Sequence, residues 1–274
     1  MSARYAREGD APPAPEPLRV QTVDAHCHLD LMGVGDDLAA ALAVSASVGV
    51  PRVVTIGVDV PSSRLAASQA ASHPGILAAV GVHPNAAEEA TDGALREIES
   101  LAALDRVRAI GETGLDYYRD TASVEAQRAS FRAHIAIAKA TGTALVIHDR
   151  EAHSDVLRLL LEEGAPERTV FHCFSGDAEM ARTCAERGYY MSFAGNVTFK
   201  NAGHLREAAA VAPLDLLLVE TDAPFLTPMP YRGRPNAPYL IPLTVRALAE
   251  AKGSDEDEVA GAVAANAERV FGPW

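Results

Sequence analysis

The stretch ALVIHDREAHSDVLRLLLEEGAPERTVFH, residues 144–172, decides the fold class of this chain. Two short runs rich in apolar and β-branched residues, ALVIH and RTVFH, flank a segment of helical periodicity at 152–163. A strand, a helix and a second strand in this order are typical of a repeated βα unit, because parallel strands need a crossover connection. Each run also ends in a histidine, so each predicted strand carries a polar side chain at its carboxyl end.

The same unit repeats along the chain. We expect strands at 18–26, 52–58, 77–83, 107–112, 144–148, 168–172, 189–193 and 215–222, and helices at 37–49, 60–72, 94–104, 123–141, 152–163, 178–187, 202–211, 244–252 and 255–270. Eight strands alternating with helices over about 250 residues predict a (β/α)8 TIM barrel in a single domain. A doubly wound open sheet is the alternative, but no Gly-rich phosphate-binding turn follows the first predicted strand.

Composition bounds the remaining organisation. With 274 residues of which 48% are hydrophobic, the chain can bury a full core, and we assign the barrel domain to 19–274. Residues 1–18 are rich in Pro, Ala and charge and lack an apolar signal region, which predicts a flexible lead-in. No run reaches the length of a membrane span, and three cysteines form no disulfide framework, so we expect a cytoplasmic protein that does not bind membranes. A net charge of −13 argues against non-specific adhesion to nucleic acid or anionic lipid.

Side chains with metal-ligand chemistry recur at the predicted strand ends. The carboxyl ends of barrel strands converge on one face, where active sites are built. Here those ends carry His26, His28, His83, Glu112, His148, His172 and Asp222. All of these except His83 are predicted metal ligands; the alternative is that the histidines face loops and have satisfied hydrogen bonds.

Within VDAHCHLD, residues 23–30, His26 and His28 are separated by one residue. Residues i and i+2 of an extended strand share a face, so both imidazoles project together while Cys27 turns away. Six ligands are too many for one tetrahedral zinc, which favours two ions that share a bridging carboxylate. We assign one ion to His26, His28, Glu112 and Asp222 and the other to Glu112, His148 and His172. Such a pair predicts hydrolytic chemistry, because bound cations make a water acidic enough to act as a nucleophile.

Eight sequence blocks, in order, resemble the signature blocks of the TatD-type metal-dependent deoxyribonucleases. They are DAHCHLD, GVHPN, GETGLDYY, VIHDREA, FHCFSGD, SFAGNVTFKNA, VETDAPFLTP and YRGRPNAPYL, spread over nearly the whole chain. The resemblance implies a cytoplasmic hydrolase of the amidohydrolase-like barrel class, acting on ester bonds as a 3′-to-5′ exonuclease on DNA. The family's metal-ligand roles fall on the six residues chosen above.

Further residues are candidates for substrate contact. His83 ends a strand at the mouth, and Arg150, Arg232 and Arg234 lie in loops that follow strand ends, so we predict that they bind phosphate. A core role for His83 and simple solvation of the arginines are the alternatives. Other loop residues of the same kind are Arg119 and Lys200, and four aromatic side chains are candidates for base stacking or for packing: Tyr117, Tyr118, Phe174 and Tyr231.

Three acidic residues and one histidine have predicted roles other than metal ligation. Glu112 and Asp222 are the predicted catalytic carboxylates, and Asp222 either carries a proton to the leaving group or acts as a ligand alone. Glu220 precedes Asp222 by two residues, which predicts that it orients a ligand, or that it is a buried hydrogen-bonding carboxylate. His134 lies in the middle of a predicted helix and is assigned a structural role.

Three functions compete at this stage. The first is a deoxyribonuclease whose substrate is single-stranded DNA or a DNA 3′ end; the second is an amidohydrolase, lactonase or phosphoesterase for small molecules on the same barrel. The third is a non-catalytic binding or scaffold protein. Imidazole ligands favour Zn²⁺, Mn²⁺ or Fe²⁺, whereas the resemblance points to Mg²⁺, so the identity of the two cations stays open. The sequence leaves the oligomeric state open, a monomer included.

Overall fold

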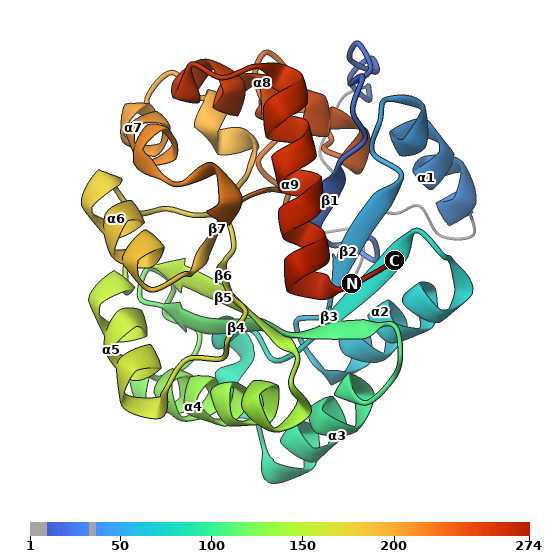
Figure 1. The fold of residues 1–274 in the computed structure, drawn as a ribbon. Coiled ribbons are helices and arrows are strands. Elements are labelled where there is room, and N and C mark those ends of the chain that lie inside the picture. The colour runs from blue at the N-terminus through green and yellow to red at the C-terminus, as the bar shows by residue number, and fades with distance from the viewer. Residues whose placement is uncertain (1–9, 33–36) are drawn as a thin grey trace. The chain divides into compact units, whose positions relative to one another are not determined.

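The computed structural model describes residues 10–32 and 37–274. In these ranges eight strands form one sheet and follow the chain in the order β1-β2-β3-β4-β5-β6-β7-β8, which confirms the (β/α)8 prediction (Figure 1). The strands are β1 (Val23–Cys27), β2 (Arg52–Ile56), β3 (Ile76–Val80), β4 (Val107–Asp116), β5 (Ala144–Arg150), β6 (Thr169–Phe171), β7 (Tyr190–Phe193) and β8 (Leu217–Val219).

Helices alternate with these strands and match the predicted ranges closely. They are α1 (Leu38–Ser47), α2 (Val60–Ser72), α3 (Asp92–Ala102), α4 (Val124–Thr141), α5 (His153–Glu163), α6 (Ala178–Glu186), α7 (Gly203–Val211), α8 (Ile241–Lys252) and α9 (Glu256–Phe271). Short 3-10 helices that the sequence pattern did not predict are η3 (Pro84–Glu89), η4 (Gly195–Thr198), η5 (Leu214–Leu216) and η6 (Pro238–Leu240). Two strand boundaries differ most from the prediction: β1 begins five residues later than expected, at Val23, and β4 continues four residues beyond its predicted end at Glu112.

The described chain divides into two compact units. The first unit comprises residues 10–32, 37–54, 176–269 and 274, and the second comprises residues 55–175 and 270–273. The assignment of one domain to 19–274 stays a prediction.

The second unit contains the parallel strands β3 to β6 and the helices α2 to α5. Parallel pairing joins β3 to β4, β4 to β5 and β5 to β6, and α3, α4 and α5 lie outside β4 and β5 (Figure 1). The strands are buried on both faces, as expected for parallel strands covered by helices. Gly114 and His148 are partners in the β4–β5 register, so this pairing sets the height of His148 relative to β4.

The first unit brings the two ends of the strand order together. β7 pairs with β8 in parallel, and just beyond β8 an isolated parallel bridge joins Ala223 to Cys27 of β1. Two backbone hydrogen bonds extend this seam: the amide of His28 donates to the Ala223 carbonyl at 2.8 Å, and the amide of Asp222 donates to the His26 carbonyl at 2.9 Å. The seam therefore sets His26, His28 and Asp222 beside one another.

The described part of the lead-in lies along the first unit. The guanidinium of Arg234 donates to the carbonyls of Asp10 and Ala11 at 2.9 and 3.2 Å, and the hydroxyl of Tyr239 donates to Pro12 at 2.7 Å. Residues 10–12 of the predicted lead-in thus accept hydrogen bonds from side chains that follow β8, and the flexibility of 1–18 stays a prediction. Residues 1–9 of that prediction lie outside the described residues.

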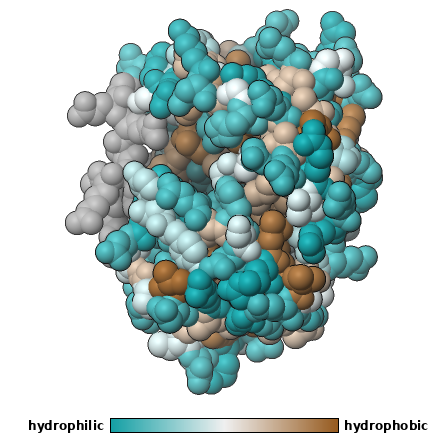
Figure 2. Space-filling view, turned by 90° about the vertical axis from the view of Figure 1, so that its left-hand side faces the viewer, coloured by the Kyte–Doolittle hydropathy of each residue, from teal (hydrophilic) through white to brown (hydrophobic). Residues whose placement is uncertain are grey.

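The large hydrophobic side chains that are exposed among the described residues lie far apart in the sequence: Val44, Leu65, Leu104, Tyr118, Leu161 and Val211. Hydrophilic side chains cover most of the face shown in Figure 2, with hydrophobic ones in small separate areas. Among the helices of residues 10–32 and 37–274, none combines the length and the apolar character that crossing a membrane requires.

Glycine is required where β4 runs closest to β5. Gly114 has φ +137°, and a Cβ built there would collide with the carbonyl oxygen of His148. Gly111 has φ +145°, and its Cβ would meet the Val146 carbonyl oxygen at 2.5 Å. These two residues flank Glu112, so their small size allows the Glu112 segment to approach β5 closely.

We expect Gly114→Ala to lower the free energy of unfolding by about 3 kcal/mol, because it adds a backbone collision to an unfavourable φ. Denaturant unfolding measures this change. Gly142→Ala is the control: Gly142 has φ +65° at the end of α4 with open space around it, so only the conformational cost of about 1 kcal/mol applies. Equal losses in the two variants would contradict the steric argument.

His134 has the structural role assigned to it. It is fully buried on α4, its Nε2 accepts from the Val82 amide at 3.0 Å, and its Nδ1 lies 2.7 Å from the Ser130 carbonyl oxygen. Burial lowers the pKa of His134 from 6.5 to about 4, although the bond to Ser130 opposes this shift. The imidazole is therefore neutral in the folded protein and links α4 to the residue before His83.

Because the unfolded chain binds a proton near pH 6.5 and folded His134 does not, stability should fall as the pH drops from about 6.5 towards 4. This group accounts for at most about 3 kcal/mol of that loss. In His134→Gln the dependence over this window should be shallower, as followed by denaturant unfolding at several pH values. His204→Gln, at an exposed position, should keep the wild-type slope; a wild-type slope in His134→Gln would contradict the assignment.

Candidate metal centre

The predicted ligands fall into two groups, each inside one unit. Glu112, His148 and His172 belong to the second unit together with His83, and His26, His28 and Asp222 belong to the first. Four of the seven lie one to three residues beyond the end of a strand and His26 lies one residue before it, whereas His148 lies two residues before the end of β5 and Glu112 four residues before the end of β4.

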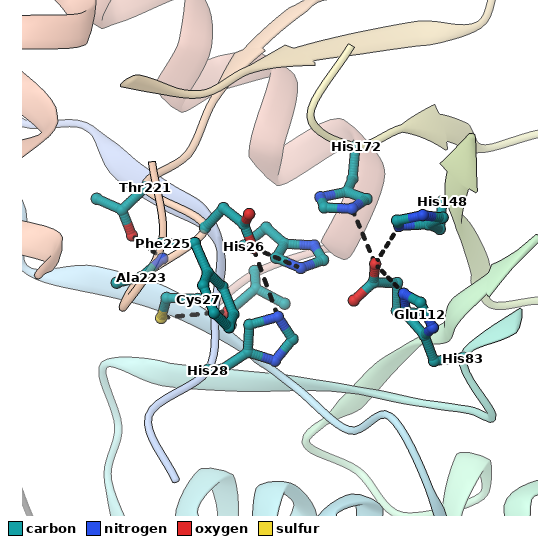
Figure 3. Close-up of polar contacts among 12 residues, drawn as sticks. His26, Cys27, His28, His83, Glu112, His148, His172, Thr221, Ala223 and Phe225 are labelled. Carbon is teal, nitrogen blue, oxygen red and sulfur yellow. Dashed lines mark hydrogen bonds and ion pairs between the residues drawn. The ribbon is translucent and has the colours of Figure 1, made fainter. Parts of the chain in front are cut away.

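In the second unit, one carboxylate oxygen faces three imidazoles. Oε1 of Glu112 lies 2.8 Å from His148 Nδ1, 2.9 Å from His172 Nε2 and 3.3 Å from His83 Nε2. Figure 3 shows the three rings around Glu112, each joined to it by a dashed line. The Glu112 residue is only 3% exposed, so these contacts are shielded from water. His83, predicted to contact substrate, is thus brought to the carboxylate of a predicted ligand.

The surroundings of Glu112 favour its ionised form. Burial is the largest single influence and would raise the pKa of Glu112. The electrostatic effects of His172 and His83 and the hydrogen bonds from His148 and His172 together outweigh burial, so the pKa lies well below its ordinary value. Burial lowers the pKa of His83 despite the nearby Glu112 carboxylate. For His148, burial also acts to lower the pKa, but the contacts with Asp116 and Glu112 raise it above its ordinary value.

Asp116 is a site residue that the sequence reasoning missed. Its Oδ2 lies 3.2 Å from His148 Nε2, so His148 has one ring nitrogen towards Glu112 and the other towards Asp116. Burial acts to raise the pKa of Asp116, but hydrogen bonding from His148 and from backbone amides lowers it to about 2. A carboxylate behind a ligating histidine fixes its ring and increases its basicity. The sequence did offer a signal: in GETGLD, Asp116 follows Glu112 by four residues, and residues i and i+4 of a strand lie on the same face.

In the first unit, two imidazoles flank one carboxylate at longer range. His28 Nε2 and His26 Nε2 lie 3.5 and 3.9 Å from Oδ1 of Asp222, and the two rings meet edge-on with centroids 5.1 Å apart. Figure 3 shows both rings next to each other. These distances exceed those of ordinary hydrogen bonds. They resemble the spacing of about 3.4 Å between two donor atoms that each lie about 2.1 Å from a shared tetrahedral cation.

The backbone holds Asp222 in an uncommon conformation. Asp222 has φ +53°, a region that few non-glycine residues adopt, and its amide is bonded to His26. Its carbonyl accepts from the Phe225 amide at 2.8 Å, which closes a tight turn. Strained backbone of this kind persists where the surrounding structure demands a particular side-chain direction. Here the turn keeps the Asp222 carboxylate near His26 and His28.

A second missed carboxylate supports β1. Asp24 is fully buried and accepts from the Thr221 amide at 2.9 Å and from the His26 amide at 3.2 Å. Burial raises the pKa of Asp24 to about 7, Thr221 opposes that shift, and Glu220 adds to it. Glu220 is likewise fully buried, with its amide bonded to the Phe193 carbonyl. Its predicted orienting role stays a prediction. Asp24 precedes His26 by two residues, the same spacing that drew attention to Glu220.

The predicted substrate-binding arginines have different surroundings. Arg150 stacks over the Tyr118 ring with 3.9 Å between its Cζ and the ring centroid, and Arg232 stacks over Phe199 at 4.2 Å. Arg234 is directed to the carbonyls of the lead-in, as described above. Phosphate binding by these three residues stays a prediction.

The donor set fits a divalent metal ion. One donor atom from each of His83, Glu112 and His148 lies within 4.8 Å of the other two, and His26, His28 and Asp222 supply imidazole nitrogen and carboxylate oxygen in the first unit. Mixed nitrogen and oxygen donors of this type suit Zn²⁺, Mn²⁺ or Fe²⁺. His26, His28 and Glu112 are buried, whereas His83, His148 and Asp222 keep 14–17% of their side chains exposed, so such an ion could be reached from solvent.

Asp116→Asn should weaken metal binding about 10- to 100-fold, because the amide holds His148 less firmly and donates less electron density to its ring. Calorimetric titration of metal-free protein with Zn²⁺ or Mn²⁺ measures the change. Asp120→Asn is the matched control, since Asp120 is exposed on the loop that follows Asp116. Unchanged affinity in Asp116→Asn would show that Asp116 does not support the centre.

Comparison with known proteins agrees with this chemistry. Residues 23–272 match the model of the family described as TatD related DNase. An uncharacterized metal-dependent hydrolase TatD of Mycobacterium tuberculosis is 46% identical over 257 residues, covering 91% of this chain and 97% of the relative. The uncharacterized metal-dependent hydrolase YabD of Bacillus subtilis is 40% identical, covering 90% of this chain and 98% of the relative.

A solved structure shares the fold. The crystal structure of YjjV, a TatD homolog from Escherichia coli, has a TM-score of 0.87 at 28% identity and covers 91% of this chain and 97% of that one. The chain therefore belongs to the TatD-related DNase family and is a metal-dependent hydrolase.

Proposed function

We propose that this protein is a deoxyribonuclease that removes nucleotides from the 3′ end of DNA, using two divalent cations. The observation that carries the proposal is the buried Glu112 carboxylate with three imidazoles around one oxygen, in a chain whose family is described as TatD related DNase. A hydrolase of a charged diester needs such a centre to stabilise negative charge at the reacting phosphorus.

We further propose that the six predicted ligands act as one dinuclear centre with Glu112 as the bridge. Support comes from their positions at the carboxyl ends of strands in a (β/α)8 fold, since these ends form the active-site face of such barrels. One ion would be held by His26, His28, Glu112 and Asp222 and the other by Glu112, His148 and His172. Zn²⁺ or Mn²⁺ fits the imidazole donors for tight binding, and Mg²⁺ is the third candidate for turnover.

The two acidic residues would have different tasks. Bound divalent cations would supply Lewis acidity, which makes a water acidic enough to lose a proton near neutral pH. The depressed pKa of Glu112 keeps this carboxylate ionised, which suits a ligand and not a proton acceptor. The Asp222 side chain is 14% exposed, against 4% for Glu112, so Asp222 is better placed to accept the proton of the attacking water and deliver it to the leaving alkoxide.

Single-stranded DNA, or a DNA 3′ end, is the proposed substrate. A net charge of −13 repels a polyanion at long range, so binding would depend on local cations. His83 beside Glu112 and the stacked guanidinium of Arg150 are the candidates in the second unit, with Arg232 and Arg234 in the first.

A small-molecule amidohydrolase, lactonase or phosphoesterase is the second candidate. The names of the relatives specify a metal-dependent hydrolase without a substrate, which favours keeping this candidate. A scaffold without catalysis is disfavoured by the complete set of six ligands.

Purified protein should shorten 3′-to-5′ an oligonucleotide labelled at its 5′ end when Mg²⁺ or Mn²⁺ is present, and chelator should abolish the reaction. Glu112→Gln should lose at least about 10³-fold of the activity, because removal of a shared ligand costs several kcal/mol of charge stabilisation. Glu99→Gln, an exposed position on α3, should behave as wild type.

Intact DNA after incubation with folded, metal-loaded wild type would contradict the nuclease proposal. Hydrolysis of lactones, amides or simple phosphoesters by the same preparation, lost in Glu112→Gln, would then identify the second candidate function.

A further inference from the structure

We propose that the loop between β4 and α4, together with Arg150, forms a subsite for the terminal nucleotide of a single-stranded nucleic acid. The base would stack at Tyr118, and its phosphate would bind the arginines beside it. This inference rests on the proposed function and adds to it the part of the substrate that is recognised. Every residue involved belongs to the second unit.

A cavity of about 240 Å³ lies at this loop. It is lined by Asp116, Tyr117, Tyr118, Arg119, Asp120, Ala122, Ser123, Val124 and Gln127. Pockets for drug-sized ligands span roughly 300–1,000 Å³, so this cavity suits a single ring system and not a longer stretch of nucleic acid. Asp116 is both a wall of the cavity and the partner of His148, which places the cavity directly beside the candidate metal centre.

Tyr118 differs from the other aromatic candidates of the second unit, Tyr117 and Phe174. Phe174 is buried at 2% exposure, and Tyr117 donates from its hydroxyl to Asp155 at 2.6 Å. Tyr118 is 61% exposed while the guanidinium of Arg150 covers its ring at 3.9 Å. An exposed phenol ring held by a cation is a suitable platform for a base, because stacking needs a flat surface and no particular base edge.

Among the described residues, Arg119, which lines the cavity, and Arg150, which stacks on Tyr118, have guanidinium groups that are not neutralised by acidic side chains. Arg128, Arg132 and Arg158 form ion pairs with acidic residues on α5. In contrast, across residues 10–32 and 37–274 neither Arg119 nor Arg150 forms an ion pair. In a chain with a net charge of −13, cations without acidic partners beside an exposed aromatic ring indicate a ligand that carries both a ring and an anion. A nucleotide has this combination, whereas a simple phosphate ester would not engage Tyr118.

The backbone of the loop is already ordered for binding. Oδ1 of Asp116 accepts from the amides of Tyr118 and Arg119, both at 3.0 Å. The buried Gln127 side chain accepts from the Asp116 amide at 2.8 Å and donates to the Asp116 carbonyl at 3.1 Å. It also donates to the Ala122 carbonyl at 3.1 Å. A loop fixed from two sides loses little conformational entropy when a ligand binds. The position of Tyr118 is therefore tied to the residue that orients His148.

The test compares two DNA substrates that differ only in the terminal base. Kinetics are measured on a single-stranded oligonucleotide with a complete 3′ nucleotide and on the same oligonucleotide with an abasic 3′ end. Wild type should have a KM about 10-fold lower for the complete end, since one stacked base contributes an effect of this order. Tyr118→Ala should lose this preference, whereas Tyr118→Phe should keep it.

Leu161→Ala serves as a surface control, because Leu161 is 67% exposed on α5 and is neither part of the proposed subsite nor a proposed metal ligand. It should retain the wild-type preference. Arg119→Gln should raise KM for both substrates and weaken the dependence of KM on salt, because it removes a phosphate contact.

The outcomes separate this inference from the proposed function. If wild type digests DNA and Tyr118→Ala keeps the preference for a complete end, the subsite is wrong and the nuclease proposal stands. If wild type digests no DNA, the nuclease proposal fails, and calorimetry with deoxyadenosine 5′-monophosphate decides the subsite. Binding that weakens about 10-fold in Tyr118→Ala supports a nucleotide site; binding that is absent or independent of Tyr118 overturns it.

Discussion

A buried carboxylate surrounded by imidazoles is the constraint on which the second unit depends. Glu112 is almost fully enclosed, and an ionised carboxylate in such surroundings is stable only with partners of opposite or polarisable charge. His83, His148 and His172 supply those partners from three further strand ends, at 2.8 to 3.3 Å. The strands must therefore approach closely, and the glycines on either side of Glu112 permit that approach.

In each unit, a further carboxylate contacts one of the histidines. Asp116 contacts the far nitrogen of His148, and Asp24 holds the backbone amide of His26 and the turn at Thr221. Both carboxylates act in the same way: a buried carboxylate that contacts an imidazole or its backbone amide fixes the direction in which the ring can bind a cation. Asp116 also has a second structural effect, because the same side chain accepts from the Tyr118 amide and lines the cavity beside Tyr118.

Much of the fold could be predicted, and candidate ligands could be chosen, because both depend on local pattern. Strand runs with a polar last residue are visible in the sequence, and the helices matched their predicted ranges within a few residues. Asp116 was missed because β4 was expected to end at Glu112, whereas Gly111 and Gly114 let the strand continue past it. Arg234 was predicted to bind phosphate from a loop, but its guanidinium donates to carbonyls more than two hundred residues earlier in the chain, a partner that no periodicity reveals.

The sequence by itself determined which side chains stand at strand ends, because a period of two and the order of βα units follow from residue types along the chain. It therefore determined the barrel class and the chemistry of the candidate ligands. Only the tertiary structure decided how those side chains meet: three imidazoles on one oxygen of Glu112, Asp116 behind His148, and a positive φ that aims Asp222 at two histidines. Distances of this kind depend on backbone approach and burial across many elements, and neither quantity is encoded in any single stretch of residues.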